Sequence, residues 1–451
     1  MNLYSRQKGF SLAEVIVGSA VFMVVAVSVY GAYTGLFKIA NLSQARSVAT
    51  QLANEQFEVI RNMPYTNIGT IGGVPAGTLY ATTSVVRSGI TFEVDTLVRN
   101  IDLSFDGTAL HGTDTNPVDN KLVQLTIICS TCQNFSSVVV TGQIAPKSGE
   151  SATTNTGALN IQVINAQGHG LANASVHVVN YSASPSINLT DTTDNDGYLE
   201  LYGVATGTNA YTITASKTGY STDQTYPVGG SGNPDPLKPN STVAAEQVTS
   251  VSFSIDTLAS LAVTSVATSC DPVANFNFSL TSSKVIDVAG LLPKYFSTFQ
   301  TGSSGALSIS SLEWDSYTAT SSDSSYDIAG IDIANPISIA PGASQNAQIV
   351  LMPKNGNSLL ITVKDSLTKA LVQNSTVELI GPSGYDKTLI TDQEAGGGAA
   401  PACLPKGQVL FQGLSAGSYS IHVSSAGYVT PTPVSVTVGS GWQEQQVFVS
   451  H

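Results

Sequence analysis

The sequence predicts an α+β domain followed by an all-β chain, in which one long N-terminal helix packs on a small antiparallel sheet and three tandem β-sandwiches follow. Three observations predict this order. Residues 10–62 run from an apolar segment into an amphipathic one without a turn signal. Residues 63–147 hold short β-branched stretches separated by turns, and residues 158–451 repeat one pattern at intervals of about 100 residues.

Composition favours an extracytoplasmic chain and argues against catalysis. The 451 residues are enough for roughly three or four domains, and only 11% are charged, against about 25% in ordinary soluble proteins. The net charge of −13 disfavours binding to nucleic acid. Four cysteines and five scattered histidines supply neither a disulfide scaffold nor a metal centre. Since the sequence also holds no Ser/His/Asp set or paired-acid cleft, we expect no enzymatic activity and no cofactor.

Residues 10–62 are expected to form one helix of about 80 Å, whose first part, 10–37, is embedded in a membrane. Between Glu14 and Lys38 lie 23 uncharged residues, enough to cross a hydrocarbon core of roughly 30 Å. Apolar residues then recur at spacings of three and four as far as Pro64, where the missing N–H ends the helix.

The charges before the apolar segment indicate its orientation in the membrane, and Glu14 indicates whether it is more than a secretory signal or an anchor. Arg6 and Lys8 precede the apolar run, so the positive-inside rule keeps residues 1–9 in the cytoplasm and sends the rest of the chain outward. A secretory signal cleaved near Gly31, or a simple membrane anchor, would share these features. Neither explains Glu14, because a carboxylate within the bilayer costs roughly 2.5–3.5 kcal/mol and needs a partner.

The residues Lys8-Gly9-Phe10-Ser11-Leu12-Ala13-Glu14 resemble the class III leader of type IV prepilins, minor pilins and the pseudopilins of type II secretion. The resemblance implies that residues 1–9 are a prepilin leader, that a prepilin peptidase cleaves after Gly9, and that Phe10 is then N-methylated. It further implies assembly with other pilins at an inner-membrane platform. There Glu14 pairs with the freed α-amino group of Phe10 in a neighbouring subunit, which makes a buried carboxylate tolerable.

Residues 63–147 alternate in polarity and predict a small antiparallel sheet, with Arg87-Ser88-Gly89 as one turn. The passage 55–65 and the two hairpins resemble minor pilins of the PilV or general-secretion I type, which implies a pilin-like domain. The expected strands include Val85-Val86, Ile90–Val94 and Leu122–Ile127.

The four cysteines leave several interpretations open. Cys129-x-x-Cys132 is compatible with half a zinc site, a redox motif, a local disulfide or two plain thiols. No second pair of ligands accompanies it in the sequence, which favours the last two. Cys270 and Cys403 fall in loops of the second and third repeats, where an exported chain can pair them as a disulfide or keep them as separate thiols.

A polar linker, 148–157, precedes three copies of one pattern at 158–256, 257–354 and 355–451. The copies share a tyrosine, a second tyrosine nine residues later, and a glycine twelve to fourteen residues upstream. Short strands with glycine turns at this spacing predict β-sandwiches. The shared residues are Tyr211, Tyr317 and Tyr419, then Tyr220, Tyr326 and Tyr428, and finally Gly197, Gly305 and Gly407. The strands expected to open the copies are 159–164, 276–280 and 359–364.

The shared glycines and tyrosines resemble carboxypeptidase regulatory-like and collagen-adhesin B-type domains, which are prealbumin-like, Ig-like sandwiches. The resemblance implies stalk or adhesive modules. The Ser, Thr, Tyr and Asn residues expected on the sandwich loops suit a surface glycan or a protein as ligand equally, and a pure spacer is the alternative. Asp191, Asp194 and Asp196 are weak candidates for calcium ligands. Their segment is rich in carboxylates, but it lacks the glutamate of a calcium-binding loop, and Asp-Gly also favours a plain turn.

These features predict a minor subunit of a type IV pilus, at the tip or sparsely inserted, that displays adhesive or spacer domains. About 300 additional residues would crowd a filament in which every subunit carried them. The expected precursor crosses the cytoplasmic membrane once, and the mature protein lies in the pilus at the cell surface. A type II secretion pseudopilin and a singly anchored surface binding protein that does not polymerise are the alternatives.

Overall fold

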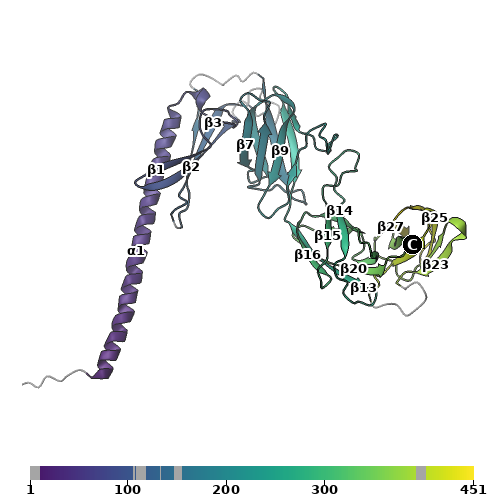
Figure 1. The fold of residues 1–451 in the computed structure, drawn as a ribbon. Helices are drawn as coiled ribbons and strands as arrows, with labels where there is room; N and C mark the ends of the chain where they lie inside the picture. The colour runs from purple at the N-terminus through teal and green to yellow at the C-terminus, as the bar shows by residue number, and fades with distance from the viewer. Residues whose placement is uncertain (1–10, 105–106, 108–117, 133, 147–154, 393–402) are drawn as a thin grey trace, which may run out of the picture.

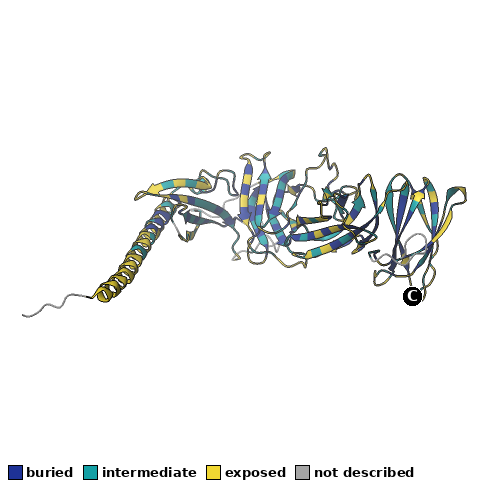
Figure 2. Ribbon diagram, turned by 60° about the horizontal axis from the view of Figure 1, so that its bottom comes forward, coloured by how far each residue is buried: buried dark blue, intermediate teal, exposed yellow. Residues whose placement is uncertain are grey.

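The computed structural model describes residues 11–104, 107, 118–132, 134–146, 155–392 and 403–451. In this part of the chain, one long helix leads to a four-stranded sheet and then to three sandwiches of two sheets each, which confirms the predicted fold class. Figure 1 shows most of the helix standing clear of the strands. Figure 2 shows the sheet and the three sandwiches in a row that ends with the C-terminal repeat.

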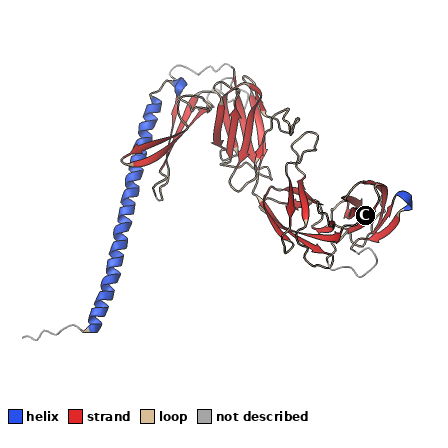
Figure 3. Ribbon diagram, in the orientation of Figure 1, coloured by secondary structure: helices blue, strands red, loops and turns tan. Residues whose placement is uncertain are grey.

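The helix α1 (Leu12–Arg61) is continuous over 50 residues, which corresponds to about 75 Å. Gly31 and Gly35 lie inside it and do not interrupt it, so the helix is a single rod in Figure 3. Its last carbonyls are capped by Asn62, whose side-chain amide donates a hydrogen bond to a backbone oxygen one turn earlier. Pro64 follows and prevents a further turn.

The two halves of α1 have different surroundings. Residues 11–33 are all exposed, whereas the second half buries one face against the neighbouring sheet. Figure 2 shows this change along the helix as a passage from exposed to buried residues. The helix is long and apolar enough to cross a membrane. The buried helix residues are Ala45, Ala49, Leu52, Ala53 and Ile60.

The sheet beside α1 is antiparallel, in the order β1-β2-β3-β4. Its first hairpin turns at Ser88 and Gly89, both with positive φ, which matches the twist of paired strands. The helix lies on β3 and β4, and a Cβ at Gly142 would stand only 2.2 Å from the Phe57 ring. Glycine therefore permits the close approach of helix and sheet. The strands are β1 (Thr82–Arg87), β2 (Ile90–Ile101), β3 (Asn120–Ile128) and β4 (Val138–Ile144).

Lys121 of β3 ties the segment after the helix to this sheet. Its side chain is buried, and Nζ donates hydrogen bonds to the backbone oxygens of Tyr65 at 2.8 Å and Ile68 at 2.6 Å. Burial lowers the pKa of Lys121 to about 8. Burial, together with the charge of Asp119, raises the pKa of Tyr65 to about 12. The two groups therefore titrate in separate pH ranges.

Each of the three repeats consists of two sheets facing one core. Repeat 1 contains β5 (Thr156–Ile164), β6 (Ser175–Asn180), β7 (Ile187–Thr192), β8 (Tyr198–Ala205), β9 (Gly207–Ser216), β10 (Asp223–Gln224), β11 (Ser241–Val243) and β12 (Val248–Ser254). Repeat 2 contains β13 (Ala259–Ala267), β14 (Asn277–Ser282), β15 (Phe296–Gln300), β16 (Ala306–Leu312), β17 (Asp315–Ser321), β18 (Tyr326–Asp332), β19 (Ile337–Ile339) and β20 (Ser344–Pro353). Repeat 3 contains β21 (Asn357–Asp365), β22 (Thr376–Ile380), β23 (Asp386–Ile390), β24 (Gln408–Leu414), β25 (Gly417–Ser424), β26 (Val434–Val438) and β27 (Trp442–Val449).

The three repeats share one topology. The first strand of each repeat pairs with the last strand in parallel, whereas the other named strand pairs within the repeats are antiparallel. The shared glycines have positive φ and accept a hydrogen bond from the first strand. A Cβ there would crowd the backbone of that strand. The hydrogen-bonded pairs are Val163 with Gly197 at 2.8 Å, Ser265 with Gly305 at 2.7 Å and Val363 with Gly407 at 2.8 Å.

The expected opening strand of the second repeat was wrong. Residues 276–280 fall in β14, the second strand, and the repeat opens with β13 (Ala259–Ala267). The β13 sequence contains mostly small residues, so its alternation is weaker than that of the phenylalanines in β14. Its partner β20 supplies the parallel pairing that defines a first strand in the other two repeats.

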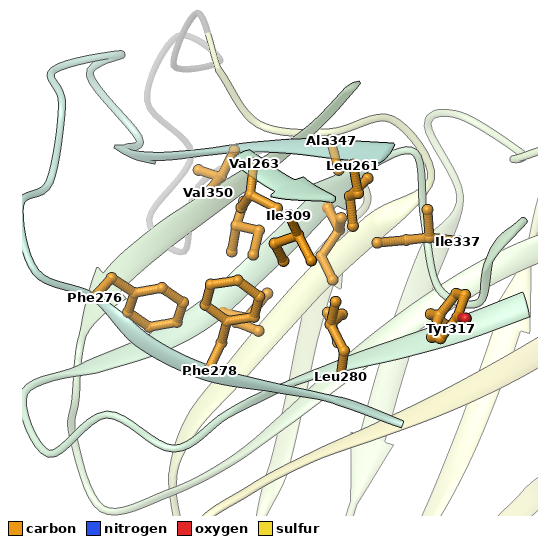
Figure 4. Packing of buried hydrophobic residues seen from close by; sticks show 14 of the residues in the cluster. Leu261, Val263, Phe276, Phe278, Leu280, Ile309, Tyr317, Ile337, Ala347 and Val350 are labelled. Atoms are coloured by element: carbon orange, nitrogen blue, oxygen red, sulfur yellow. The ribbon is translucent and has the colours of Figure 1, made fainter. Parts of the chain in front are cut away.

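The first shared tyrosine of each repeat is buried in the core of that repeat. Tyr211, Tyr317 and Tyr419 are at most 2% exposed, and each hydroxyl donates to a backbone oxygen of the preceding turn. Figure 4 shows Tyr317 at one end of the repeat 2 core, which also contains Phe276 and Phe278. The repeated tyrosine is thus a structural residue, because burial of its ring is combined with a satisfied hydroxyl.

We expect Lys121→Met to remove a pH-dependent gain in the stability of the N-terminal sheet. The folded pKa of about 8 lies below the ordinary value of 10.5, so the unfolded chain holds the extra proton between these values. The free energy of unfolding of the wild type therefore rises from about pH 8 to pH 10. Urea-dependent proteolysis of β1–β4, read by mass spectrometry, measures this slope. Lys387→Met, at an exposed lysine, is the control, and an unchanged slope in Lys121→Met contradicts the prediction.

Candidate functional site

Glu14 lies in the first turn of α1, where it shares hydrogen bonds with the residue that caps the helix. The Ser11 hydroxyl accepts from the Glu14 backbone N–H at 3.3 Å. The Glu14 carboxylate accepts from the Ser11 backbone N–H at 2.9 Å and from the Ser11 hydroxyl at 3.0 Å. This reciprocal capping box gives the carboxylate a partner within its own chain. The Ser-x-x-Glu spacing of Ser11 and Glu14 is the sequence signal for this cap.

The expected processing residues precede this turn. Gly9 and Phe10 lie outside the residues that the structure describes. The helix begins at Leu12, two residues after the expected methylation site, and Ser11 and Glu14 are exposed at its start.

The first half of α1 presents large apolar side chains on every face. Leu12 is 80% exposed and Phe22 is 73% exposed, and exposed apolar residues continue as far as Ile39. A helix that is apolar all round is stable only inside a membrane or among other apolar elements. This half therefore requires lipid or neighbouring protein around it.

All four cysteines are paired. Cys129 and Cys132 form a local disulfide that closes the turn after β3. The Cys270–Cys403 disulfide joins repeat 2 to repeat 3 across a sequence separation of 133 residues. Neither pair is therefore available as thiolate ligands for a metal.

The three candidate calcium ligands do not come together. The carboxylate of Asp191 is buried and accepts a hydrogen bond from Nε of Arg99 at 2.6 Å. Asp194 accepts from the backbone N–H groups of Asp196 and Tyr198, at 3.0 Å and 2.8 Å, and so shapes the turn. Within the described ranges, no three His, Cys, Asp or Glu side chains are grouped as metal ligands.

The joint between the N-terminal sheet and repeat 1 depends on Arg99 of β2. Its guanidinium forms an ion pair with Asp191 of β7 through two nitrogens. The neighbouring Asn100 donates to the backbone oxygen of Tyr202 at 2.8 Å. A small apolar cluster beside them contains Val118, Ala158 and Tyr202. Polar and apolar contacts together hold the sheet against the sandwich.

The joint between repeats 1 and 2 is a chain of alternating charges. In repeat 1, Lys238 pairs with Asp223 at 2.5 Å, and Lys294 of repeat 2 lies 4.0 Å from the same carboxylate. Lys294 and Lys284 both pair with Glu313, at 2.8 Å and 2.7 Å. Burial lowers the pKa of Lys284, and Glu313 partly offsets this. Loop backbones add hydrogen bonds across the same joint.

The joint between repeats 2 and 3 is an apolar interface with hydrogen bonds across it. The side-chain amide of Gln408 exchanges two hydrogen bonds with the backbone of Ile331, at 2.9 Å and 3.0 Å. The Trp442 indole donates to the backbone oxygen of Ile328 at 2.8 Å. Leu360 and Leu410 of repeat 3 belong to the buried cluster of repeat 2. Repeat 3 therefore extends the core of repeat 2 across the joint, while it keeps a separate core of its own.

The sequence did not predict the residues that hold the domains together at the three joints. Arg99, Lys294 and Gln408 stand outside the repeated pattern, and each meets a partner in another domain, far away in the chain. Their spacing carries no local signal, because it is the packing of complete domains that brings them together.

Residues 4–30 match the family described as the prokaryotic N-terminal methylation motif. The chain carries a prepilin-type motif. It runs directly into the apolar half of α1, and such a motif implies processing by a peptidase and assembly with other pilins. No curated protein matches the sequence.

Three solved structures are similar to parts of this chain. The Bacillus anthracis TIE protein is 14% identical over 82% of this chain and 61% of that one, with a TM-score of 0.19. The chain thus spans about three fifths of that protein's length. A streptococcal ancillary pilin is 12% identical over 65% of this chain and 98% of that one, with a TM-score of 0.18. BcpA, the major pilin subunit of Bacillus cereus, is 11% identical over 65% and 99%, with a TM-score of 0.16.

We expect Arg99→Ala to loosen the first joint by about 3 kcal/mol, because it leaves the Asp191 carboxylate buried without its counter-ion. Deuterium exchange at the Asn188 N–H, which donates to the Gly72 oxygen across this joint at 2.7 Å, measures the opening. Arg87→Ala breaks only the exposed pair with Glu55 and serves as the control.

Adding Asp191→Asn to Arg99→Ala removes the unpaired charge and is expected to recover part of the lost protection. If Arg99→Ala exchanges no faster than Arg87→Ala, the ion pair does not hold the joint.

Proposed function

We propose that this protein is a minor subunit of a type IV pilus, at the tip or sparsely inserted, that carries three sandwich domains outward as an adhesive or spacer stalk. The precursor crosses the cytoplasmic membrane once, and a prepilin peptidase removes residues 1–9. The mature subunit then enters a filament with other pilins through the assembly platform of the inner membrane.

One observation carries this proposal. The methylation motif at residues 4–30 is continuous with a helix that is apolar and exposed in its first half and packed on a sheet in its second half. A secretory signal does not need the second half, because it is removed before the domain folds. A plain anchor would use Glu14 only for the helix cap with Ser11, whereas in a filament the same carboxylate can also pair with the α-amino group of Phe10 in a neighbouring subunit. Assembly of helix against helix gives both features a purpose.

The size of the stalk supports a minor position. The described residues 156–392 and 403–449 form three two-sheet sandwiches, each with more strands than the four-stranded sheet beside the helix. Figure 1 shows them leading away from the helix and its sheet. If every subunit of a filament carried this mass, neighbouring stalks would compete for the same space. A few copies, or a single copy at the tip, avoid this conflict.

The role that we propose is binding or spacing without catalysis. Glycans and proteins are the ligand classes that suit the many Ser, Thr, Asn and Tyr side chains on sandwich loops. The acidic net charge of −13 favours neutral or basic ligands over nucleic acid.

N-terminal mass spectrometry of protein from its native cells tests the processing step. We expect the mature chain to begin with N-methylated Phe10. A chain that begins at Met1, or near Ala32, contradicts the proposal and leaves an anchored or secreted sandwich protein.

Glu14→Ala is expected to abolish incorporation into filaments, measured as the amount of protein in sheared surface pili. Ser11→Ala removes the same helix cap but keeps the carboxylate, so it separates loss of the cap from loss of the assembly acid. Glu58→Ala, an exposed acid in the same helix, is the matched control. We expect both control variants to assemble, and normal assembly of Glu14→Ala would favour a singly anchored protein.

Deletion of the gene distinguishes a pilus from a secretion system that shares the same N-terminal motif. Loss of surface adhesion with normal protein secretion supports the proposal. Loss of secreted enzymes with normal pili identifies a type II secretion pseudopilin instead.

A further inference from the structure

The first and last strands of every repeat are parallel neighbours. In repeat 1, β5 and β12 pair from Ala158 with Val248 to Ile164 with Ser254. In repeat 2, β13 pairs in the same sense with β20, and in repeat 3, β21 pairs with β27. The chain therefore enters each repeat at one end of this strand pair and leaves at the other end.

This arrangement determines how a pull along the chain loads the hydrogen bonds. Pulling the two ends apart slides the first strand past the last, because parallel strands are entered and left at opposite ends. All hydrogen bonds of the evenly spaced parallel ladder then resist together. If both forces acted at the same end, the bonds would open one after another. Resistance to forced unfolding depends on the barrier to unfolding, which shear across a complete ladder raises.

The disulfide between the last two repeats adds a covalent path. Cys270 follows β13 by three residues, and Cys403 lies five residues before β24. A pull that reaches repeat 3 can therefore pass from β13 through the two sulfur atoms to β24. The chain between the two cysteines, which holds β20 and β21, is then excluded from extension.

We propose that the three repeats form a tension-bearing stalk, in which shear across the β5–β12 pair of repeat 1 and the Cys270–Cys403 bond between repeats 2 and 3 resist a pull between α1 and repeat 3. The inference rests on the proposed function only for the source of the pull, which is a ligand held by the last repeat while the helix is fixed in a filament. The mechanical property itself belongs to the isolated chain.

Single-molecule pulling of the full chain, held in detergent through α1, tests the shear geometry. One handle is fixed at the N-terminus, and an azide-bearing residue replaces either Ser252 or Glu246, which are both exposed. Ser252 lies near the end of β12, whereas Glu246 lies before its start and donates its backbone N–H to Thr156 at 2.8 Å. The Ser252 handle pulls β5 and β12 from opposite ends of the pair and loads them in shear. The Glu246 handle pulls them from the same end and peels them apart.

We expect the repeat 1 event to need a severalfold higher force with the Ser252 handle than with the Glu246 handle. The event is recognised by a released length of roughly 340 Å. Equal forces with the two handles would overturn the shear mechanism.

A second measurement uses handles at the two ends of the chain, with and without a reducing agent. Reduction is expected to lengthen the fully extended chain by roughly 470 Å, because the segment enclosed by Cys270 and Cys403 becomes free to extend. Reduction of Cys129–Cys132 adds only about 7 Å and does not obscure this change. An unchanged length would overturn the covalent path.

The results are independent of pilus assembly. If both pulling tests give the expected results but Glu14→Ala still enters surface filaments, the tension-bearing stalk is supported and the assembly role of Glu14 is contradicted. If the pulling tests fail but Glu14→Ala stays out of filaments, the assembly role is supported and the tension-bearing stalk is contradicted.

Discussion

The structure depends on one continuous helix whose first half is apolar and exposed and whose second half packs on a sheet. The first half of α1 is apolar on all sides, and the second half is apolar on one face only. Small residues such as Ala49 and Ala53 let that face approach the sheet closely, and Gly142 on the sheet gives room to the Phe57 ring. Because α1 has no internal bend, the direction of the apolar half fixes where the sheet stands, and the sheet positions repeat 1 through Arg99.

The three joints between the domains are held by different kinds of contact. An ion pair, a hydrogen bond of Asn100 and a small apolar cluster hold the first joint. A chain of five alternating charges and backbone hydrogen bonds hold the second. The third joint buries apolar residues of repeat 3 against the core of repeat 2 and has a disulfide beside it. Ionic contacts weaken as salt screens them, whereas buried apolar contacts and covalent bonds do not. The joint between repeats 2 and 3 therefore depends least on the salt concentration.

The sequence predicted the elements well where the pattern was local. The helix, its end before Pro64, the hairpin turn at Ser88-Gly89 and the glycine and tyrosine positions of the repeats follow from short-range rules of spacing and conformation. The first strand of repeat 2 was missed, because its small residues give a weak alternation that only the parallel partner β20 makes visible. The internal partner of Glu14 was missed although Ser11 stood three residues before it.

By itself, the sequence determined that the chain has an apolar helix with a methylation motif and a series of repeated sandwiches, because hydropathy, turns and motifs are properties of neighbouring residues. Only the tertiary structure decided that Asp191 pairs with Arg99 and does not join a calcium site, and that Cys270 meets Cys403. It alone also decided that every repeat is entered and left at opposite ends of one strand pair. These contacts join residues distant in the chain, and only complete folding of both partners brings them within bonding distance.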